Sequence, residues 1–264
     1  MNLEVPSGSI VGFVGENGSG KTTTLRAILN LIKYDEGQIK VLGLDSIKDE
    51  KEIKEQVGVV LDDPFFYENT KLKEINTVMK HIYKNWDTNL YENYLKSFSL
   101  DINKAFKELS KGMKMKLKIS IALSHRPKPL ILDEPTSGLD PVSREDILDF
   151  FMDFIQDEEN SIFLSSHITS DLDKIADYII FIHNGNIILK ENKDILFSDY
   201  GLVKSSEEDF RKINPEYVVN YRSNAFSYEV LVNNKQQVLA DQTQLTIETI
   251  TIETIMLLLI RGEK

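Results

Sequence analysis

A glycine-rich octapeptide that follows an apolar run constrains the fold of this chain most. Residues 15–22 read Gly-Glu-Asn-Gly-Ser-Gly-Lys-Thr and match the pattern GxxxxGK[ST]. The apolar run 10–14 predicts a strand in front of this segment, and the pattern of 22–32 predicts a helix behind it. Such a turn directs backbone N–H groups at an anion, and the positive end of the helix dipole adds to their field. The sequence therefore predicts a phosphate-binding loop.

The side chains of this loop indicate a nucleotide that is bound together with magnesium. We expect Lys21 to reach the β- and γ-phosphates and the Thr22 hydroxyl to be a ligand of Mg²⁺. The predicted nucleotide-binding residues of the loop are Gly15, Asn17, Gly18, Ser19, Gly20, Lys21, Thr22 and Thr23.

Composition narrows the class of nucleotide-binding protein. The chain has 264 residues, of which 41% are apolar, so it can bury a substantial core. Its 31 basic and 42 acidic residues give a net charge of −11, which argues against a nucleic-acid partner because phosphate backbones would be repelled. The absence of cysteine fits a reducing compartment. Without a long apolar segment or a signal peptide in the sequence, we expect a cytoplasmic protein.

Strand and helix patterns alternate along most of the chain. The predicted strands are 10–14, 37–42, 57–61, 130–132, 161–165, 178–182 and 187–190, and helical patterns cover 22–32, 71–124 and 143–154. The dipeptide Asn184-Gly185 between the last two strands predicts a hairpin at the sheet edge. The fold class is therefore α/β. We expect a mainly parallel P-loop NTPase sheet with an inserted helical subdomain, an antiparallel edge and a small C-terminal α/β extension.

A pair of carboxylates follows the buried strand 130–132. Functional groups gather at the carboxyl ends of strands in parallel sheets, and Asp133 and Glu134 stand at such an end. We expect Asp133 to hold Mg²⁺ and Glu134 to take a proton from an attacking water.

Three further motifs occur in a fixed order around this acid pair. Leu-Ser-Lys-Gly-Met at 109–113 precedes it, Ser-Gly-Leu-Asp at 137–140 follows it, and Ser-Ser-His at 165–167 ends a predicted strand. Over residues 8–200 the ordered set resembles the ATP-binding-cassette (ABC) family of ATPases, whose signature is LSGGQ. The resemblance implies ATP and Mg²⁺ as cofactors, with Glu134 as general base and His167 at the γ-phosphate beside Lys21.

The family resemblance also implies partners. Two cassettes pack head to tail in this family, so Ser110 and Gly112 would close on the nucleotide of a second ABC subunit, identical or paralogous. A single cassette without a membrane span looks like the ATPase subunit that powers a transporter with a separately encoded transmembrane permease, at the cytoplasmic face of the membrane. The LSKGM form looks most like exporters of drugs, peptides or lipids.

Three departures from the family pattern stand out. Asp62 occupies the place of the usual Q-loop glutamine, where a carboxylate can still accept from Mg²⁺-bound water. Lys111 and Met113 replace a glycine and a glutamine of the signature. The segment before Gly15 offers no aromatic residue to stack on adenine, because Phe13 should point into the core, and we expect weak nucleotide affinity.

The predicted organisation is an ABC ATPase domain over 1–200, with a core of 1–64 and 125–200 and a helical subdomain at about 65–124, followed by a C-terminal extension over 201–264. Two alternatives remain at this stage. One is a soluble regulatory or ribosome-associated ABC protein that is not coupled to transport. The other is a GTP-binding switch, but Asn192-Lys193-Asp194 has its carboxylate one place early for the guanine-reading NKxD motif.

Overall fold

The computed structural model describes residues 1–61, 66–224, 227–241 and 245–263. The chain forms two compact units. The first unit comprises residues 3–11 and 20–166, and the second comprises residues 1–2, 12–19 and 167–264. In the described ranges, no helix combines the length and the apolar character that a membrane crossing requires.

The main sheet has six strands and is mostly parallel. Its order is β4 (Gly58–Val60), β5 (Pro129–Asp133), β6 (Ser161–Ser166), β1 (Ile10–Val14), β7 (Tyr178–His183) and β8 (Asn186–Asn192). In the first unit β4, β5 and β6 run parallel, and in the second unit β7 and β8 are antiparallel. Both residues of the β7–β8 turn have positive φ, 48° at Asn184 and 76° at Gly185, as a two-residue hairpin requires. The predicted fold class is confirmed.

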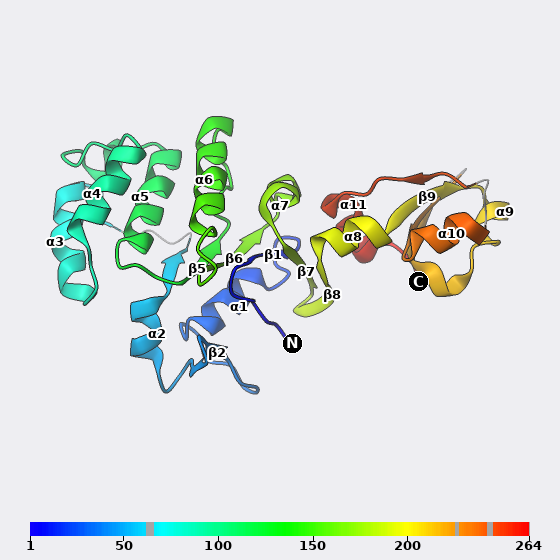
Figure 1. The fold of residues 1–264 in the computed structure, drawn as a ribbon, viewed down its shortest axis with the longest axis horizontal. Coiled ribbons are helices and arrows are strands. Elements are labelled where there is room, and N and C mark those ends of the chain that lie inside the picture. The colour runs from blue at the N-terminus through cyan, green and yellow to red at the C-terminus, as the bar shows by residue number, and fades with distance from the viewer. Residues whose placement is uncertain (62–65, 225–226, 242–244, 264) are drawn as a thin grey trace. The chain divides into compact units, whose positions relative to one another are not determined.

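The first unit carries the expected helices and a further one over residues 50–56 that was not predicted (Figure 1). They are α1 (Lys21–Ile28), α2 (Glu50–Gln56), α3 (Leu72–Ile82), α4 (Thr88–Ser97), α5 (Lys111–Leu123) and α6 (Pro141–Phe154), with a short 3₁₀ turn at Phe106–Glu108. Two further segments differ from the prediction. Helix α1 stops at Ile28, and Asn30 then takes a left-handed φ of 53°. The strand expected over 37–42 is a two-residue hairpin of β2 (Lys40–Val41) and β3 (Leu44–Asp45), because Leu42 and Gly43 both turn at positive φ.

Helices α3, α4 and α5 enclose an apolar core of their own. Its buried members include Leu72, Ile75, Tyr91, Leu95 and Leu117. The half-buried ring of Trp86 packs against this core with its centroid 5.4 Å from that of Tyr91. Its indole N–H donates to Asn76 Oδ1 at 2.8 Å. That partner offsets the cost of removing the indole N–H from water.

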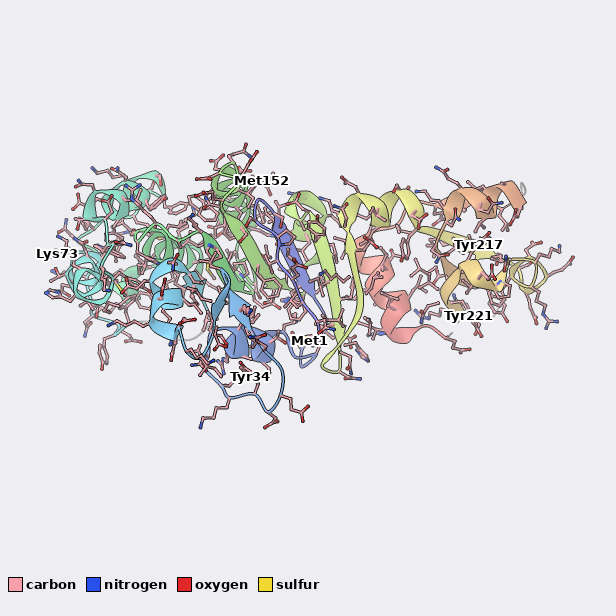
Figure 2. All side chains as sticks on the ribbon, turned by 60° about the horizontal axis from the view of Figure 1, so that its bottom comes forward. Met1, Tyr34, Lys73, Met152, Tyr217 and Tyr221 are labelled. Atoms are coloured by element: carbon pink, nitrogen blue, oxygen red, sulfur yellow. The ribbon has the colours of Figure 1, made fainter. Side chains whose placement is uncertain are left out.

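The second unit holds α7 (Thr169–Ile175), α8 (Lys193–Asp199) and a small α/β region after residue 200. Its sheet has the order β10 (Val218–Ser223), β11 (Tyr228–Val232), β9 (Gly201–Ser205), β12 (Ile247–Glu248), and its helices are α9 (Glu207–Phe210), α10 (Lys235–Asp241) and α11 (Ile252–Arg261), with a 3₁₀ turn at Pro215–Tyr217. The ring of Phe210 stacks on Tyr228 at 4.6 Å and contacts Tyr221 at 4.7 Å, in the region where Figure 2 labels Tyr217 and Tyr221. The C-terminal α/β extension has its own core of buried valine and isoleucine side chains, and these partly buried rings pack against it.

Candidate functional site

The first helical turn of α1 meets the acidic end of β5. Gly20 takes a left-handed conformation with φ of 110°, which ends the loop and lets α1 begin at Lys21. One residue later, Thr22 Oγ1 donates to Asp133 Oδ2 at 2.8 Å. These two residues are 111 positions apart in sequence. The fold thus brings two of the three predicted magnesium ligands, Thr22 and Asp133, into direct contact.

Asp133 is buried and held by two hydroxyl groups. Its side chain is only 4% exposed, and Oδ1 accepts from Ser165 Oγ at 2.5 Å while Oδ2 accepts from Thr22. Ser165 lies on β6 directly opposite Asp133 in the parallel register. A buried carboxylate needs such partners because its desolvation is costly. Ser165 was not predicted in this role. The sequence signal that could have indicated it is a small hydroxyl residue at the carboxyl end of a strand.

Glu134 sits beside Asp133 in a different environment. Its φ is +51°, an uncommon conformation for a residue with a side chain, and its backbone N–H donates to Ser165 Oγ at 3.1 Å. Its Oε1 lies 3.4 Å from the ammonium nitrogen of Lys21. The Glu134 side chain is 20% exposed and that of Lys21 6%. Water therefore has access to the Glu134 carboxylate, whereas the Asp133 carboxylate is buried.

The loop residues of the second unit form a tight turn with a buried hydroxyl. A Cβ on Gly15 would lie 2.4 Å from the Ile182 carbonyl oxygen and 2.5 Å from Ser19 Oγ, so only glycine fits there. Ser19 Oγ is buried and has no hydrogen-bond partner in the described part of the chain. The Ser19 carbonyl accepts from the Gly185 N–H at 2.9 Å. Asn17 and Gly18 are exposed.

The signature-like segment packs against the start of α6. Ser110 caps α5, and its hydroxyl accepts from the Met113 N–H at 3.2 Å. A Cβ on Gly112 would lie 2.5 Å from Ser143 Oγ, so this glycine allows the close approach of α5 to α6. The Lys111 side chain extends over Gly138, where a Cβ would meet its Nζ at 2.5 Å. Within the first unit, the two motifs at 109–113 and 137–140 are therefore neighbours.

The structure also places Thr23 and His167. Thr23 is exposed in the first turn of α1. His167 follows the last residue of β6 and has an exposed side chain in the second unit. Asp62 lies outside the described residues, although the carbonyl of its neighbour Leu61 accepts from Lys118 Nζ at 2.8 Å.

The donor set fits a magnesium nucleotide better than a metal held by protein alone. Among the described residues, no group of three or more His, Cys, Asp or Glu side chains could hold a metal ion. Mg²⁺ is usually bound by one or two protein oxygens together with substrate phosphates and water. Thr22 and Asp133 offer two hard oxygen donors in contact. These two residues fit a magnesium ion that is bound together with phosphate oxygens.

An apolar groove opens elsewhere on the first unit. Its volume is about 480 Å³, and its lining includes Ile28, Leu31, Ile53, Val57, Ile82 and Tyr83. Leu31 is 50% and Ile82 56% exposed. Glu50, Lys51, Lys54 and Glu55 of α2 add charged groups of both signs to the lining. The groove is therefore an apolar surface with a mixed-charge border.

Comparisons with known proteins agree on one family. Residues 1–137 match the family described as ABC transporter. The chain is 38% identical to the bacitracin transport ATP-binding protein BcrA of Bacillus licheniformis over 71% of this chain and 62% of that protein, so it spans about three fifths of that relative. It is 33% identical to the lantibiotic transport ATP-binding protein SrtF of Streptococcus pyogenes, over 74% of this chain and 83% of that protein.

Two solved structures each match about three quarters of this chain. An ATP-binding subunit of an ABC transporter superposes with a TM-score of 0.66 at 28% identity, over 74% of this chain and 83% of that one. A dimeric ATP-binding cassette bound to ADP and phosphate gives a TM-score of 0.64 over 72% of this chain and 88% of that one. At 22% identity the second match indicates the fold alone.

Proposed function

Because this chain belongs to the ABC transporter family, we propose that it is an ATP-binding and ATP-hydrolysing subunit that powers a transporter. The observation that carries the proposal is the convergence of α1 and β5. Thr22 contacts Asp133 at 2.8 Å, and Lys21 lies 3.4 Å from Glu134. Phosphate-binding and acidic groups from distant parts of the sequence thus meet at one point.

The roles of the residues follow from their surroundings. Thr22 and Asp133 would hold Mg²⁺, which when bound neutralises charge on the phosphate oxygens. Lys21 pairs with Glu134 in this structure. Phosphate oxygens would compete for the Lys21 ammonium, and the Glu134 carboxylate would then be available to accept a proton from water. His167 would contact the γ-phosphate, and the loop residues 15–23 would bind the triphosphate.

A second ABC subunit would complete the site. Ser110 and Gly112 stand at the N-terminus of α5, where the positive end of the helix dipole favours an anion. In a head-to-tail pair, this end of each subunit would close on the nucleotide of the other. The named relatives are transport proteins, so a regulatory ABC protein without a transport role is not favoured.

The partner in the membrane would be a separately encoded permease. We assign the groove beside Leu31 and Ile82 to a short cytoplasmic segment of that permease, with apolar side chains for the groove and charged residues for its border. Such docking would place the protein at the cytoplasmic face of the membrane. The relatives named for bacitracin and lantibiotic transport support export of a peptide antibiotic, another drug or a lipid.

Nucleotide-dependent pairing tests the proposal without the permease. The Glu134→Gln variant should form dimers when MgATP is added, and chelation of the metal should return it to monomers. Lys21→Ala in the same background should abolish the shift, because it removes the cation at the phosphates. Light scattering after size exclusion measures the mass. A parent chain that binds no MgATP at millimolar concentration would contradict the proposed function.

A further inference from the structure

The C-terminal helix of the extension ends at the phosphate-binding loop. A guanidinium nitrogen of Arg261, the last residue of α11, lies 3.6 Å from Glu16 Oε1 in the loop. We propose that Arg261 is a positioning residue that raises the nucleotide affinity of the loop by pairing with Glu16. The inference rests on the proposed nucleotide binding and gives the extension a part in it.

Helix α11 is fixed on the second unit at its beginning. Thr251 caps it, with the hydroxyl accepting from the Thr254 N–H at 3.1 Å, and Ile252 and Ile255 are fully buried. The Ile252 N–H also approaches Asp173 Oδ1 of α7 at 3.4 Å. Helix α11 is therefore seated on α7 and does not end at the loop as a loose tail.

Helix α7 in turn packs against the strand that leads into the loop. A Cβ on Gly12 of β1 would lie 2.9 Å from both methyl groups of Leu172, so glycine at this position lets α7 approach the strand. Three residues further along the chain the loop begins at Gly15. A continuous set of packed elements thus connects α11 to the base of the loop.

The backbone on the other side of Arg261 is held as well. The Gly262 N–H donates to the Leu258 carbonyl at 2.9 Å, and Glu263 exchanges two backbone hydrogen bonds with Tyr221 of β10 at 2.7 and 2.9 Å. Because residues on both sides are tied down, the Arg261 side chain starts from a fixed point.

Charge explains why this pair would matter to the loop. A carboxylate at Glu16 adds negative charge beside the place where a triphosphate would bind, and its 41% exposure leaves it only partly screened. Pairing with Arg261 neutralises that charge. Exposed ion pairs contribute at most about 1 kcal/mol, which corresponds to about a fivefold change in affinity. The expected effect is therefore small but measurable.

The test compares variants of the full chain in their binding of MgATP, followed with a fluorescent ATP analogue. Arg261→Ala should weaken binding about two- to fivefold, Arg261→Glu by more, and Arg261→Lys should restore most of the affinity. The losses should shrink as ionic strength rises. Arg211→Ala is the matched control. Arg211 is an exposed arginine of the same extension, and it pairs with Glu207, four residues earlier in the chain.

A Glu16→Gln background separates positioning from direct contact. If Arg261 acts through Glu16, Arg261→Ala should have no effect once Glu16 is neutral, and the turnover number at saturating ATP should stay at the parent value throughout. An equal loss in both backgrounds, or no loss in either, would overturn the inference. Lys21→Ala serves as the reference for lost binding. Failure of the parent to bind would instead count against the proposed function.

Discussion

The site at the end of β5 and the extension after residue 200 differ in the burial of their charged side chains. Asp133 is 4% exposed and Lys21 6%, and the carboxylate is held by two hydroxyl groups. In the described part of the extension, the buried polar side chains are the uncharged Ser205 and Asn220, and ion pairs such as Lys204 with Glu248 are about half exposed.

This difference indicates where chemistry is to be expected. Burying a charged group is costly, and it persists where partners or function require it. The first unit buries the charged side chains of Lys21 and Asp133. Among its described residues, the extension buries no charged side chain. The extension should therefore influence the nucleotide site through contacts, with no reaction chemistry of its own.

The largest difference between the two regions is expected when one carboxylate in each is neutralised. Glu134→Gln should reduce ATP hydrolysis by about 10²- to 10⁴-fold, because it removes the proposed general base while keeping the size of the side chain. Glu248→Gln in the extension should leave the rate unchanged. Phosphate release under saturating MgATP measures both. Comparable rates for the parent and Glu134→Gln would remove Glu134 from the mechanism.

The same contrast applies to the lysines. Lys21→Ala should weaken MgATP binding by about tenfold or more, since a charged hydrogen-bond donor to phosphate is lost from a buried place. Lys204→Ala should bind like the parent, because its ammonium faces solvent and Glu248. Isothermal titration compares the two. Equal affinities for both variants would show that burial does not mark the functional lysine.

Alanine substitutions at two close-packed glycines, one in each region, compare the effects on stability and on hydrolysis. Gly112→Ala should destabilise the fold by about 1–3 kcal/mol, because the added methyl group meets Ser143 Oγ at 2.5 Å, and it should also reduce hydrolysis. Gly201→Ala in β9 meets the Ile247 side chain at 2.3 Å, and the loss should be confined to stability. Chemical denaturation and ATPase rates separate the two effects. Restoration of Gly112→Ala by Ser143→Gly would identify the clash as the cause.

Sequence alone could predict the elements that carry local patterns. The phosphate loop, the strand before Asp133 and the Asn184-Gly185 turn each have a short signal, and the sheet follows from their alternation. It could not predict Ser165 as a partner of Asp133, because that contact depends on the parallel register of β5 and β6. The approach of Arg261 to Glu16 likewise depends on tertiary packing between distant segments. The domain boundaries and the role of His167 remain predictions.

The smallest expected effect is on the pH dependence of the free energy of unfolding, through His125, which is not one of the proposed site residues. Burial lowers the pKa of His125, whose ring stacks on Tyr83 at 4.1 Å. The unfolded chain then binds more protons than the folded one below about pH 6.5, so the free energy of unfolding should fall as the pH drops through that range. His125→Phe should flatten this dependence, and His81→Gln, at an exposed histidine of α3, should not. Denaturation curves at pH 7.5 and 5.5 would contradict the account if His125→Phe kept the parent slope.

We propose that α1 and β5 share one magnesium ion through Thr22 and Asp133. A crystal structure with Mg²⁺ and a nonhydrolysable ATP analogue measures this most directly. We expect Thr22 Oγ1 at about 2.1 Å from the metal and the Asp133 carboxylate beside it, directly or through one water. A metal coordinated away from both residues, with the hydrogen bond between Thr22 and Asp133 unchanged, would contradict the account.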